Sequence, residues 1–552
     1  MQELIFTHLE QHAQQRPDEP FLINHDGAVY SWRDSAQQVV AIATSLSSIL
    51  PQTGCKVSIL AENSAEWTLA ELGIMRAGHI SAATFTTMTA DNFSYVIDFA
   101  EIELIFVGAA SNWPQVRHTL PQRVTVVALP GVDVDGADYS FAEFIALGNG
   151  QKPPAMPALD DLSVFVFTSG TTGKPKAVMH SLRTIYQSAN TVLQIFRQQG
   201  LSQRRFICYL PLAHIGEKSI TVMHAILCGA SIHYCENPQE LLPMLRNVRP
   251  TMVVGVPRIW ELLLQSVLKE FGESVEDLQQ QLQGNNSEPL AAQIREFLGL
   301  DQTVFRMTGS ALSPQAVKDW YHLFGAELME LFGQTELLPL TTHEVGKSTQ
   351  GTGAGSAAPG HQIRISDQGE VLGRGPCAAL GYYKNPEKTA ETFVDGWVHT
   401  GDKGYLDDNG NLFIVGRVSD EFKTSKGKFV APGPIESSFS KAVVVEQQFL
   451  YGLGLTQPVM LCTLGASAQD LTDQELQQQL LDLTETLNAT LESHERIGAI
   501  ICSRSNWTGE NGLLTHTHKI KKDQVQAHHQ QQIDQAARHM AGGNRQTLFA
   551  WA

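Results

Sequence analysis

The sequence predicts an α/β fold, with a large N-terminal domain of parallel-rich sheets and helices and a small C-terminal α+β domain. Short apolar runs rich in β-branched residues alternate with helical patterns through most of the first 415 residues, as in parallel sheets. A chain of 552 residues is too long for one core and should divide. The pattern changes near residues 416–422, and we expect the domains to span residues 1–417 and 418–552.

The strands are expected at apolar runs, with helices between them. The runs occupy residues 55–61, 103–109, 123–129, 162–168, 231–235 and 251–256. Helical patterns cover residues 65–78 and 219–230, and a Pro-rich connector covers residues 151–161. The Gln-rich stretch 271–294 predicts a polar helix or loop, and residues 346–360 a Gly/Ser-rich loop. Asp-Asn-Gly at 408–410 predicts a hairpin turn, and the polar residues from Gln524 onward favour helix.

Composition excludes several classes of protein. A hydrophobic content of 43% with 17% charged residues is globular, and a net charge of −18 argues against a nucleic-acid or anionic-membrane binder. Seven cysteines without CxxC spacing predict reduced thiols. The N-terminus lacks the pattern of a signal peptide, and no run approaches the roughly 18 apolar residues of a membrane span. We expect a cytoplasmic protein, with peripheral contact to a membrane left open.

The stretch FTSGTTGKPKAVMHS (167–181) follows an apolar run and is rich in glycines, hydroxyls and lysines. Such residues bring backbone N–H groups and positive charge to a phosphate. A Walker A loop does not fit, because Gly170 and Gly173 enclose only two residues and Pro175 follows Lys174. The stretch therefore predicts phosphate binding outside the usual P-loop fold.

Four further segments carry polar groups of the kinds a nucleotide site needs. They are LMELFGQTEL (328–337), GWVHTGDKGYL (396–406), GRVSDEFKTSKGKFVAPGPIES (416–437) and LLTHTHKIKK (513–522). Together and in this order they resemble the adenylate-forming enzymes over roughly residues 10 to 523. Within that superfamily the chain is most similar to long-chain fatty-acyl-CoA synthetases, on YLPLAHIGEK (209–218), RPTMVVGVPRIWE (249–261), RMTGSALSP (306–314), VAPGPIE (430–436) and NGLLTHTHKIKK (511–522).

The resemblance implies the adenylate-forming fold, with a mobile C-terminal domain, and a reaction in two halves. A medium- or long-chain fatty acid and ATP give acyl-AMP and pyrophosphate, and CoA then displaces AMP. The expected cofactors are ATP, Mg²⁺ and CoA. Residue chemistry agrees, because adenylation gives a carboxylate a good leaving group and the charge on the phosphate calls for lysine and a metal ion.

The resemblance also implies roles for individual residues. The phosphate loop comprises Thr168, Ser169, Gly170, Thr171, Thr172, Gly173 and Lys174. The adenine pocket comprises Gly309, Ser310, Ala311, Gly333 and the stacking ring of Phe332. Thr335 should contact phosphate and Glu336 should bind Mg²⁺, since a hard cation prefers oxygen ligands. Asp402 should bind the ribose hydroxyls, assisted by Arg417.

The remaining roles fall on the small domain and the acyl pocket. Lys519 is the expected catalytic lysine, in competition with Lys521 and Lys522, and Lys423 should approach AMP. Lys426 and Lys428 should meet the phosphates of CoA, although a solvated basic face explains them equally well. His214 and Trp260 should border the acyl pocket, or else pack in a core.

Three positions depart from the family pattern. Ser419 stands where the hinge usually has Asp or Lys, Gln334 varies within the adenine motif, and His516 replaces the proline before the catalytic lysine. None removes a group that the chemistry requires. Two alternatives stay open: delivery of acyl-AMP to an acyl carrier protein or another acceptor, and a non-catalytic acyl- or nucleotide-binding protein.

Overall fold

The structure is a computed structural model that describes most of the chain. The described residues are 5–168, 174–197, 204–272, 275–284, 287–311, 313, 315–339, 341–342, 353–440, 442, 444–465, 468, 471–514, 519–541 and 546–552. They divide into a first unit (residues 1–364, 372–400 and 406–412) and a second, smaller unit (residues 365–371, 401–405 and 413–552). The boundary expected after Arg417 stays a prediction.

Two seven-stranded sheets form the first unit, and both are mainly parallel. The first sheet has the order β13 (Met329–Glu330), β12 (Phe305–Thr308), β11 (Met252–Gly255), β9 (Arg205–Cys208), β10 (Ser231–Tyr234), β1 (Pro20–Ile23) and β2 (Val29–Ser31). The second has the order β20 (Gly381–Tyr382), β8 (Lys176–Ser181), β7 (Leu162–Thr168), β4 (Ile80–Ser81), β3 (Lys56–Leu60), β5 (Ile102–Val107) and β6 (Thr125–Ala128). Antiparallel pairing is confined to β1–β2, β7–β8 and β8–β20.

The apolar runs of the sequence form these strands because parallel strands are covered on both faces. Four consecutive residues of β3 and four of β5 are buried. All six predicted runs are confirmed, as β3, β5, β6, β7, β10 and β11. The parallel-rich sheets of the predicted fold class follow directly from them.

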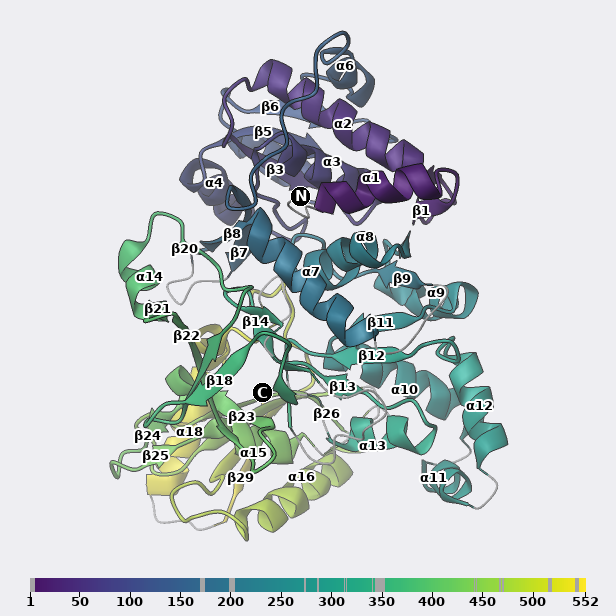
Figure 1. Ribbon diagram of the computed structural model, residues 1–552. Helices are drawn as coiled ribbons and strands as arrows, with labels where there is room; N and C mark the ends of the chain where they lie inside the picture. Colours follow the sequence, from purple (N-terminus) through teal and green to yellow (C-terminus); the bar gives the residue numbers. More distant parts are fainter. Residues whose placement is uncertain are drawn as a thin grey trace. The chain divides into compact units, whose positions relative to one another are not determined.

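Helices cover these sheets, and several begin at side-chain caps. Those of the first unit are α1 (Ile5–Gln15), α2 (Trp32–Ile49), α3 (Ala65–Arg76), α4 (Ala90–Phe99), α5 (Trp113–Val116), α6 (Phe141–Ala146), α7 (Leu182–Arg197), the π-helix η2 (Glu217–Met223), α8 (His224–Cys228), α9 (Leu241–Val248), α10 (Pro257–Phe271), α11 (Val275–Gln283), α12 (Glu288–Phe297), α13 (Gln315–Leu323) and α14 (Pro386–Thr392). Ser31 and Asp34 form a capping box at α2. Helix α2 packs on α3, and α7 packs on α8 (Figure 1).

Two large apolar cores and a small cluster of Val178, Ala379 and Tyr382 lie in the described part of the first unit. The larger core includes residues of both seven-stranded sheets, such as Phe106, Phe165 and Phe206. The second core gathers around Trp260 and Tyr321, on helices α10 and α13. Because the two sheets share one core, the ends of their strands are held in fixed relation within this unit.

Further strands follow β13 along the chain, and their residues 365, 370–371, 401–405 and 413–417 belong to the second unit. They are β14 (Gly333–Gln334) with β15 (Leu338–Pro339), β16 (Thr341–Thr342) with β17 (Ser356–Ala357), and a sheet of β18 (Gln362–Ile365), β19 (Glu370–Arg374), β22 (Trp397–Leu406), β21 (Phe393–Val394) and β23 (Leu412–Arg417). Asp407 accepts the N–H of Asn411 at 2.7 Å in the turn between β22 and β23, as the Asp-Asn-Gly signal predicts.

The second unit has its own small sheet and helices. Its sheet has the order β26 (Val445–Tyr451), β27 (Val459–Leu464), β28 (Ala499–Ser503) and β29 (Leu548–Trp551), and a separate hairpin joins β24 (Phe422–Lys423) to β25 (Phe429–Val430). Its helices are α15 (Pro432–Phe439), α16 (Asp473–Asn488), α17 (Lys522–His528) and α18 (Gln530–Ala541). Among the described residues, no helix is both long and apolar enough to cross a membrane. The seven cysteines are free thiols.

Candidate functional site

The expected adenine segments lie together at the carboxyl ends of neighbouring parallel strands. Strands β12 and β13 pair in parallel, and the N–H of Leu331 donates to the carbonyl of Thr308 at 2.8 Å. Residues 309–311 and 331–333 therefore follow these strands side by side. Ser310 and Ala311 are exposed, and Phe332 is half-buried. In open α/β sheets, ligands bind at such strand ends.

A buried ion pair supports the segment that follows β12. The Lys318 ammonium donates to Glu330 at 2.7 Å, and the second oxygen of Glu330 accepts the N–H of Ser313 at 2.9 Å. Burial raises the pKa of Glu330, and Lys318 opposes this shift. The sequence alone does not reveal this support, because Lys318 and Glu330 come from separate elements.

Phe332 and Gly333 lead into a tight hairpin. The backbone N–H of Phe332 donates to the Thr341 hydroxyl at 2.8 Å. A Cβ on Gly333 would collide with the carbonyl oxygen of Leu338, so only glycine lets β14 and β15 approach this closely. The turn between these two strands carries Thr335 and Glu336.

The Glu336 carboxylate is fixed at one oxygen. The Tyr382 hydroxyl donates to Glu336 Oε1 at 2.7 Å, and the Ala379 N–H donates to the Glu336 carbonyl at 2.9 Å. Glu336 Oε2 meets no hydrogen-bond donor within the described part of the chain. Sequence reasoning missed Tyr382, which comes 46 residues later in the chain.

This carboxylate fits a Mg²⁺ ion that is held mainly by its substrate. The described residues contain no group of three or more His, Cys, Asp or Glu side chains that could hold a metal. Mg²⁺ at phosphate sites typically takes one or two carboxylates together with phosphate oxygens and water. One oriented carboxylate with an available oxygen, as at Glu336, meets that requirement.

The glycine-rich stretch connects two antiparallel strands. Strand β7 ends at Thr168, β8 begins at Lys176, and these two residues pair with each other. A Walker A loop instead joins a strand to a helix, which agrees with the exclusion drawn from the sequence. Ser169, Gly170, Thr171, Thr172 and Gly173 lie outside the described residues.

Two lysines leave this connection toward different neighbours. The Lys174 ammonium lies 5.0 Å from the centre of the Tyr95 ring on α4. The Lys176 ammonium lies 5.0 Å from the centre of the Tyr382 ring, whose hydroxyl binds Glu336. The sequence motif assigns Lys174 to the phosphates and does not single out Lys176. In the structure, Lys176 contacts the ring of Tyr382, whose hydroxyl donates to Glu336.

His214 lies in the segment that follows β9. Its Nδ1 accepts the N–H of Gly216 at 3.1 Å, and its ring is half-buried. Asn63 holds the preceding backbone, since its amide donates to the Leu210 carbonyl at 2.7 Å and accepts the Leu212 N–H at 3.0 Å. These two bonds fix the segment that leads to His214.

Trp260 is a core residue of helix α10. Its side chain is fully buried and meets the Tyr321 ring edge to face, with 5.4 Å between ring centres. The indole also lies directly against Gly255, at the end of β11. Packing accounts for its burial, and contact with an acyl chain stays a prediction.

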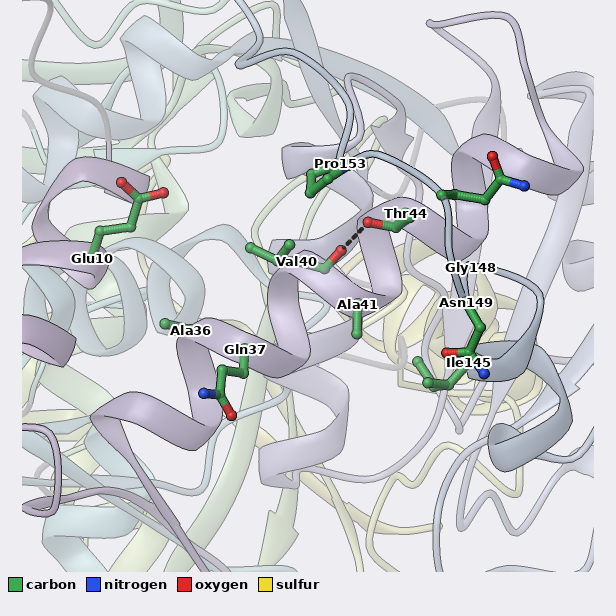
Figure 2. A pocket seen from close by; sticks show the side chains of 11 residues that line it. Glu10, Ala36, Gln37, Val40, Ala41, Thr44, Ile145, Gly148, Asn149 and Pro153 are labelled. Atoms are coloured by element: carbon green, nitrogen blue, oxygen red, sulfur yellow. Dashed lines mark hydrogen bonds between the residues drawn. The ribbon is translucent and has the colours of Figure 1, made fainter.

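A hollow lies elsewhere on the first unit. It measures about 490 Å³ and is bordered by helix α2, by Glu10 of α1, by Ile145 of α6 and by residues that follow α6 (Figure 2). Its lining includes Val40, Thr44 and Ile145 but none of the predicted site residues. We assign no function to it.

In the second unit, Asp402 and Arg417 form an ion pair. Arg417 Nη1 donates to Asp402 Oδ1 at 2.9 Å, and Asp402 is nearly buried. The preceding Gly401 has a φ of +68° and donates its N–H to Glu370 at 2.9 Å. The structure thus brings together the acidic and basic groups expected to bind ribose.

The expected hinge begins directly after Arg417. Ser419 lies in a 3₁₀ turn, Val418–Asp420. The next two acidic side chains are paired within the second unit: Lys522 donates to Asp420 at 2.5 Å, and Lys403 donates to Glu421 at 2.6 Å.

The β24–β25 hairpin presents three further basic residues of the predicted site. Lys423, Lys426 and Lys428 are all exposed on it. The Lys423 ammonium lies 5.4 Å from the centre of the Phe429 ring. Exposure of this kind suits contact with an anionic ligand and equally a solvated basic face.

The expected catalytic lysine directly precedes an isolated strand bridge. Leu514 and Ile520 form an isolated antiparallel bridge, and the Lys521 N–H donates to the Leu513 carbonyl at 2.9 Å. Lys519 is exposed directly before this bridge, and residues 515–518 lie outside the described part. Of the three lysines in competition for this role, Lys522 donates to Asp420.

Parallel strand ends, a glycine-rich connection and a carboxylate turn are typical of a nucleotide-binding α/β protein. The chain matches the family model described as AMP-binding enzyme over residues 9–383, and the AMP-binding enzyme C-terminal domain over residues 420–540. It therefore belongs to the AMP-binding enzyme family, and the predicted membership is confirmed.

Similar proteins agree with this membership. The peroxisomal long chain acyl-CoA synthetase 6 of Arabidopsis thaliana is 26% identical, over 86% of this chain and 76% of its own. Long-chain-fatty-acid–CoA ligase 1 of Homo sapiens is 26% identical, over 94% of this chain and 83% of its own. The adenylation domain of a carboxylate reductase from Mycobacterium chelonae has a TM-score of 0.78 at 19% identity, covering 97% of this chain and 91% of that one. This likeness confirms the adenylate-forming fold.

Proposed function

We propose that this chain is an ATP- and Mg²⁺-dependent fatty acid–CoA ligase that forms an acyl-AMP intermediate. The observation that carries the proposal is the Glu336 carboxylate, held by Tyr382 at one oxygen on a turn that follows the adenine segments. The curated relatives named above, a long chain acyl-CoA synthetase and a long-chain-fatty-acid–CoA ligase, support a fatty acid as the substrate.

In the first half-reaction, a fatty-acid carboxylate oxygen attacks the α-phosphorus of ATP, and the bond to pyrophosphate breaks. We assign the β- and γ-phosphates to the loop from Thr168 to Lys174, and we add Lys176 because Tyr382 connects it with Glu336. When bound, Mg²⁺ neutralises charge on the phosphate oxygens. Thr335 and Glu336 orient the phosphates, so that catalysis rests on positioning and electrostatic stabilisation.

The nucleoside contacts are assigned to three places. Phe332 stacks on adenine, with Gly309, Ser310, Ala311 and Gly333 lining the pocket by their backbones. Asp402 accepts hydrogen bonds from the ribose hydroxyls, and Arg417 holds its carboxylate in place at 2.9 Å. Lys423 approaches the AMP phosphate. A carboxylate is suited to ribose because it can accept bonds from both hydroxyls.

In the second half-reaction, the thiol of CoA attacks the acyl carbonyl, and AMP leaves with the bonding electrons. Lys519 is assigned to the substrate carboxylate and α-phosphate of the first half-reaction, Ser419 to the hinge, and Lys426 and Lys428 to the phosphates of CoA. His214 and Trp260 are assigned to the acyl pocket. A cytoplasmic location, an acyl carrier protein as acceptor and peripheral contact with a membrane stay predictions.

The direct test is incubation of the purified chain with Mg-ATP and a pool of C2 to C18 acids, with and without CoA. Mass spectrometry should detect acyl-CoA only when CoA is present, together with AMP, and should identify the preferred chain length. Acyl-AMP that accumulates despite CoA would move the chain to the carrier-loading class. The absence of any acyl adduct from the whole pool, with no AMP released, would contradict the proposal.

A further inference from the structure

His180 is a buried polar residue on the strand that follows the glycine-rich connection. It lies on β8, and its side chain is completely buried. Its Nε2 lies 2.8 Å from the carbonyl oxygen of Thr335, and its Nδ1 lies 3.2 Å from the Thr184 hydroxyl. Because a carbonyl oxygen only accepts, the proton must be on Nε2, which donates to Thr335. Burial lowers the pKa of His180 to about 4, so the ring is neutral near pH 7.

The bond from His180 is one of three that join one ribbon of the chain to the Thr335–Glu336 turn. This ribbon is formed by the paired strands β8 and β20 and by residues 379–380, which lead into β20. Strand β20 pairs with β8, with Gly381 opposite Met179 and Tyr382 opposite Val178. From this ribbon, the Ala379 N–H donates to the Glu336 carbonyl at 2.9 Å, and the Tyr382 hydroxyl donates to Glu336 Oε1 at 2.7 Å. The backbone on both sides of the Glu336 side chain is therefore tied to the ribbon.

We propose that His180 is a positioning residue that fixes the Thr335–Glu336 turn against β8, so that the Glu336 carboxylate faces the metal-bound phosphates in one orientation. The inference rests on the proposed function, and it concerns the metal-dependent half-reaction alone. Without the Nε2–H donor, the Thr335 carbonyl is left unbonded and the turn can rotate about its remaining attachments. The carboxylate then loses orientation while all groups outside the turn stay in place.

Three variants separate this role from a general need for a buried histidine. His180→Leu keeps a similar volume without a donor, and His180→Gln places an amide donor near the original Nε2 position. His224→Leu is the matched control, because His224 is also fully buried, in an aromatic environment between Phe196 and Phe206. Acyl-AMP formation, thioester formation from supplied acyl-AMP, and Mn²⁺ binding in the presence of α,β-methylene-ATP are measured for each.

His180→Leu should weaken Mn²⁺ binding to the nucleotide complex and slow acyl-AMP formation by roughly 10- to 100-fold, as for residues that orient a metal ligand. Thioester formation from acyl-AMP should change by less than about twofold, and His180→Gln should regain most of the loss. Equal Mn²⁺ affinity in His180→Leu and His224→Leu would overturn the proposal, as would equal loss of both half-reactions. If His180→Leu does not fold, His180→Gln against His180→Asn, whose amide is too short to reach Thr335, decides in the same way. A wild-type chain that forms no acyl-AMP would instead contradict the proposed function.

Discussion

Glu217 is a single buried acid at the start of the π-helix that follows His214. Its carboxyl group contacts the Thr221 side chain, the Cys208 thiol and the backbone of Tyr209, which is the first residue after strand β9. Burial raises the pKa of Glu217 from an ordinary 4.5 to about 8, against the opposing effect of these hydrogen bonds. The group is therefore protonated at neutral pH. A protonated carboxyl can occupy an apolar interior that an isolated carboxylate cannot.

The pKa of Glu217 makes the stability of the chain depend on pH. Below about pH 4.5 both the folded and the unfolded chain hold the proton, and the contribution of this group is fully present. Between about 4.5 and 8 unfolding releases the proton, so the free energy of unfolding falls as the pH rises, by about 1.4 kcal/mol per pH unit at most. Glu217→Gln should therefore match the wild type at pH 5 and melt at a higher temperature at pH 8.

Thermal melts of both proteins from pH 5 to 8.5 measure this difference. Glu387→Gln, an exposed residue on α14, is the control and should follow the wild-type profile. A wild-type profile in Glu217→Gln as well would show that Glu217 is ionised in the folded chain at neutral pH.

At the scale of elements, a buried ion pair also holds the π-helix. Lys218 donates to Glu71 of α3, and both side chains are almost completely buried. The Ser81 hydroxyl also donates to Glu71 at 2.8 Å, and the Lys218 ammonium lies 5.3 Å from the centre of the Trp67 ring. Along the chain, helix α3 falls between strands β3 and β4 of the second sheet, and η2 falls between strands β9 and β10 of the first sheet. The ion pair therefore joins a helix that connects strands of one seven-stranded sheet to a helix that connects strands of the other.

Breaking this pair from one side should be costly. Lys218→Met leaves the Glu71 carboxylate buried without its partner and should lower the free energy of unfolding by about 3–5 kcal/mol. The double variant Lys218→Met with Glu71→Met should recover most of that loss, because no uncompensated charge remains. Denaturant titration of the single and double variants measures both values.

The exposed pair Lys388–Glu391 on α14 is the matched control. Its side chains are 44% and 66% exposed, so Lys388→Met should cost less than about 1 kcal/mol. Equal costs for Lys218→Met and Lys388→Met would contradict a stabilising role for the buried pair.

The sequence predicts the positions of strands better than it predicts which distant side chains contact each other. Strands such as β3 and β5 are legible because burial on both faces requires continuous apolar runs. The two-residue strands β14 and β15 carry no such pattern, yet they place Thr335 and Glu336. The motif residues of the site can also be predicted, because each motif is a pattern of neighbouring residues in the sequence. Tyr382, His180 and Glu71 are not, because their roles depend on contacts that only the folded chain creates, across 46 or more residues of sequence.

At the scale of the whole molecule, the proposed residues are shared between the two units. Glu336, Tyr382 and the strands that flank the glycine-rich connection belong to the first unit, and Asp402 and Lys519 belong to the second. The proposed reaction also has two halves with different needs: the first builds charge on a phosphate, and the second displaces AMP by a thiol. A variant of the second unit that slows only one half-reaction therefore tests what that unit contributes to it.

Lys519→Ala should lower pyrophosphate formation by about 10²- to 10³-fold, the scale expected when one donor to a developing negative charge is removed. ATP binding should persist, and most thioester formation from supplied acyl-AMP and CoA should remain, because that step no longer requires the lysine at the α-phosphate. Lys521→Ala is the matched control, since Lys521 lies two residues away and is also exposed. Pyrophosphate release and thioester formation are measured separately for both variants. An active Lys519→Ala beside an inactive Lys521→Ala would transfer the catalytic role to Lys521. Equal loss of both half-reactions in Lys519→Ala would place the lysine in a step common to them, such as nucleotide binding.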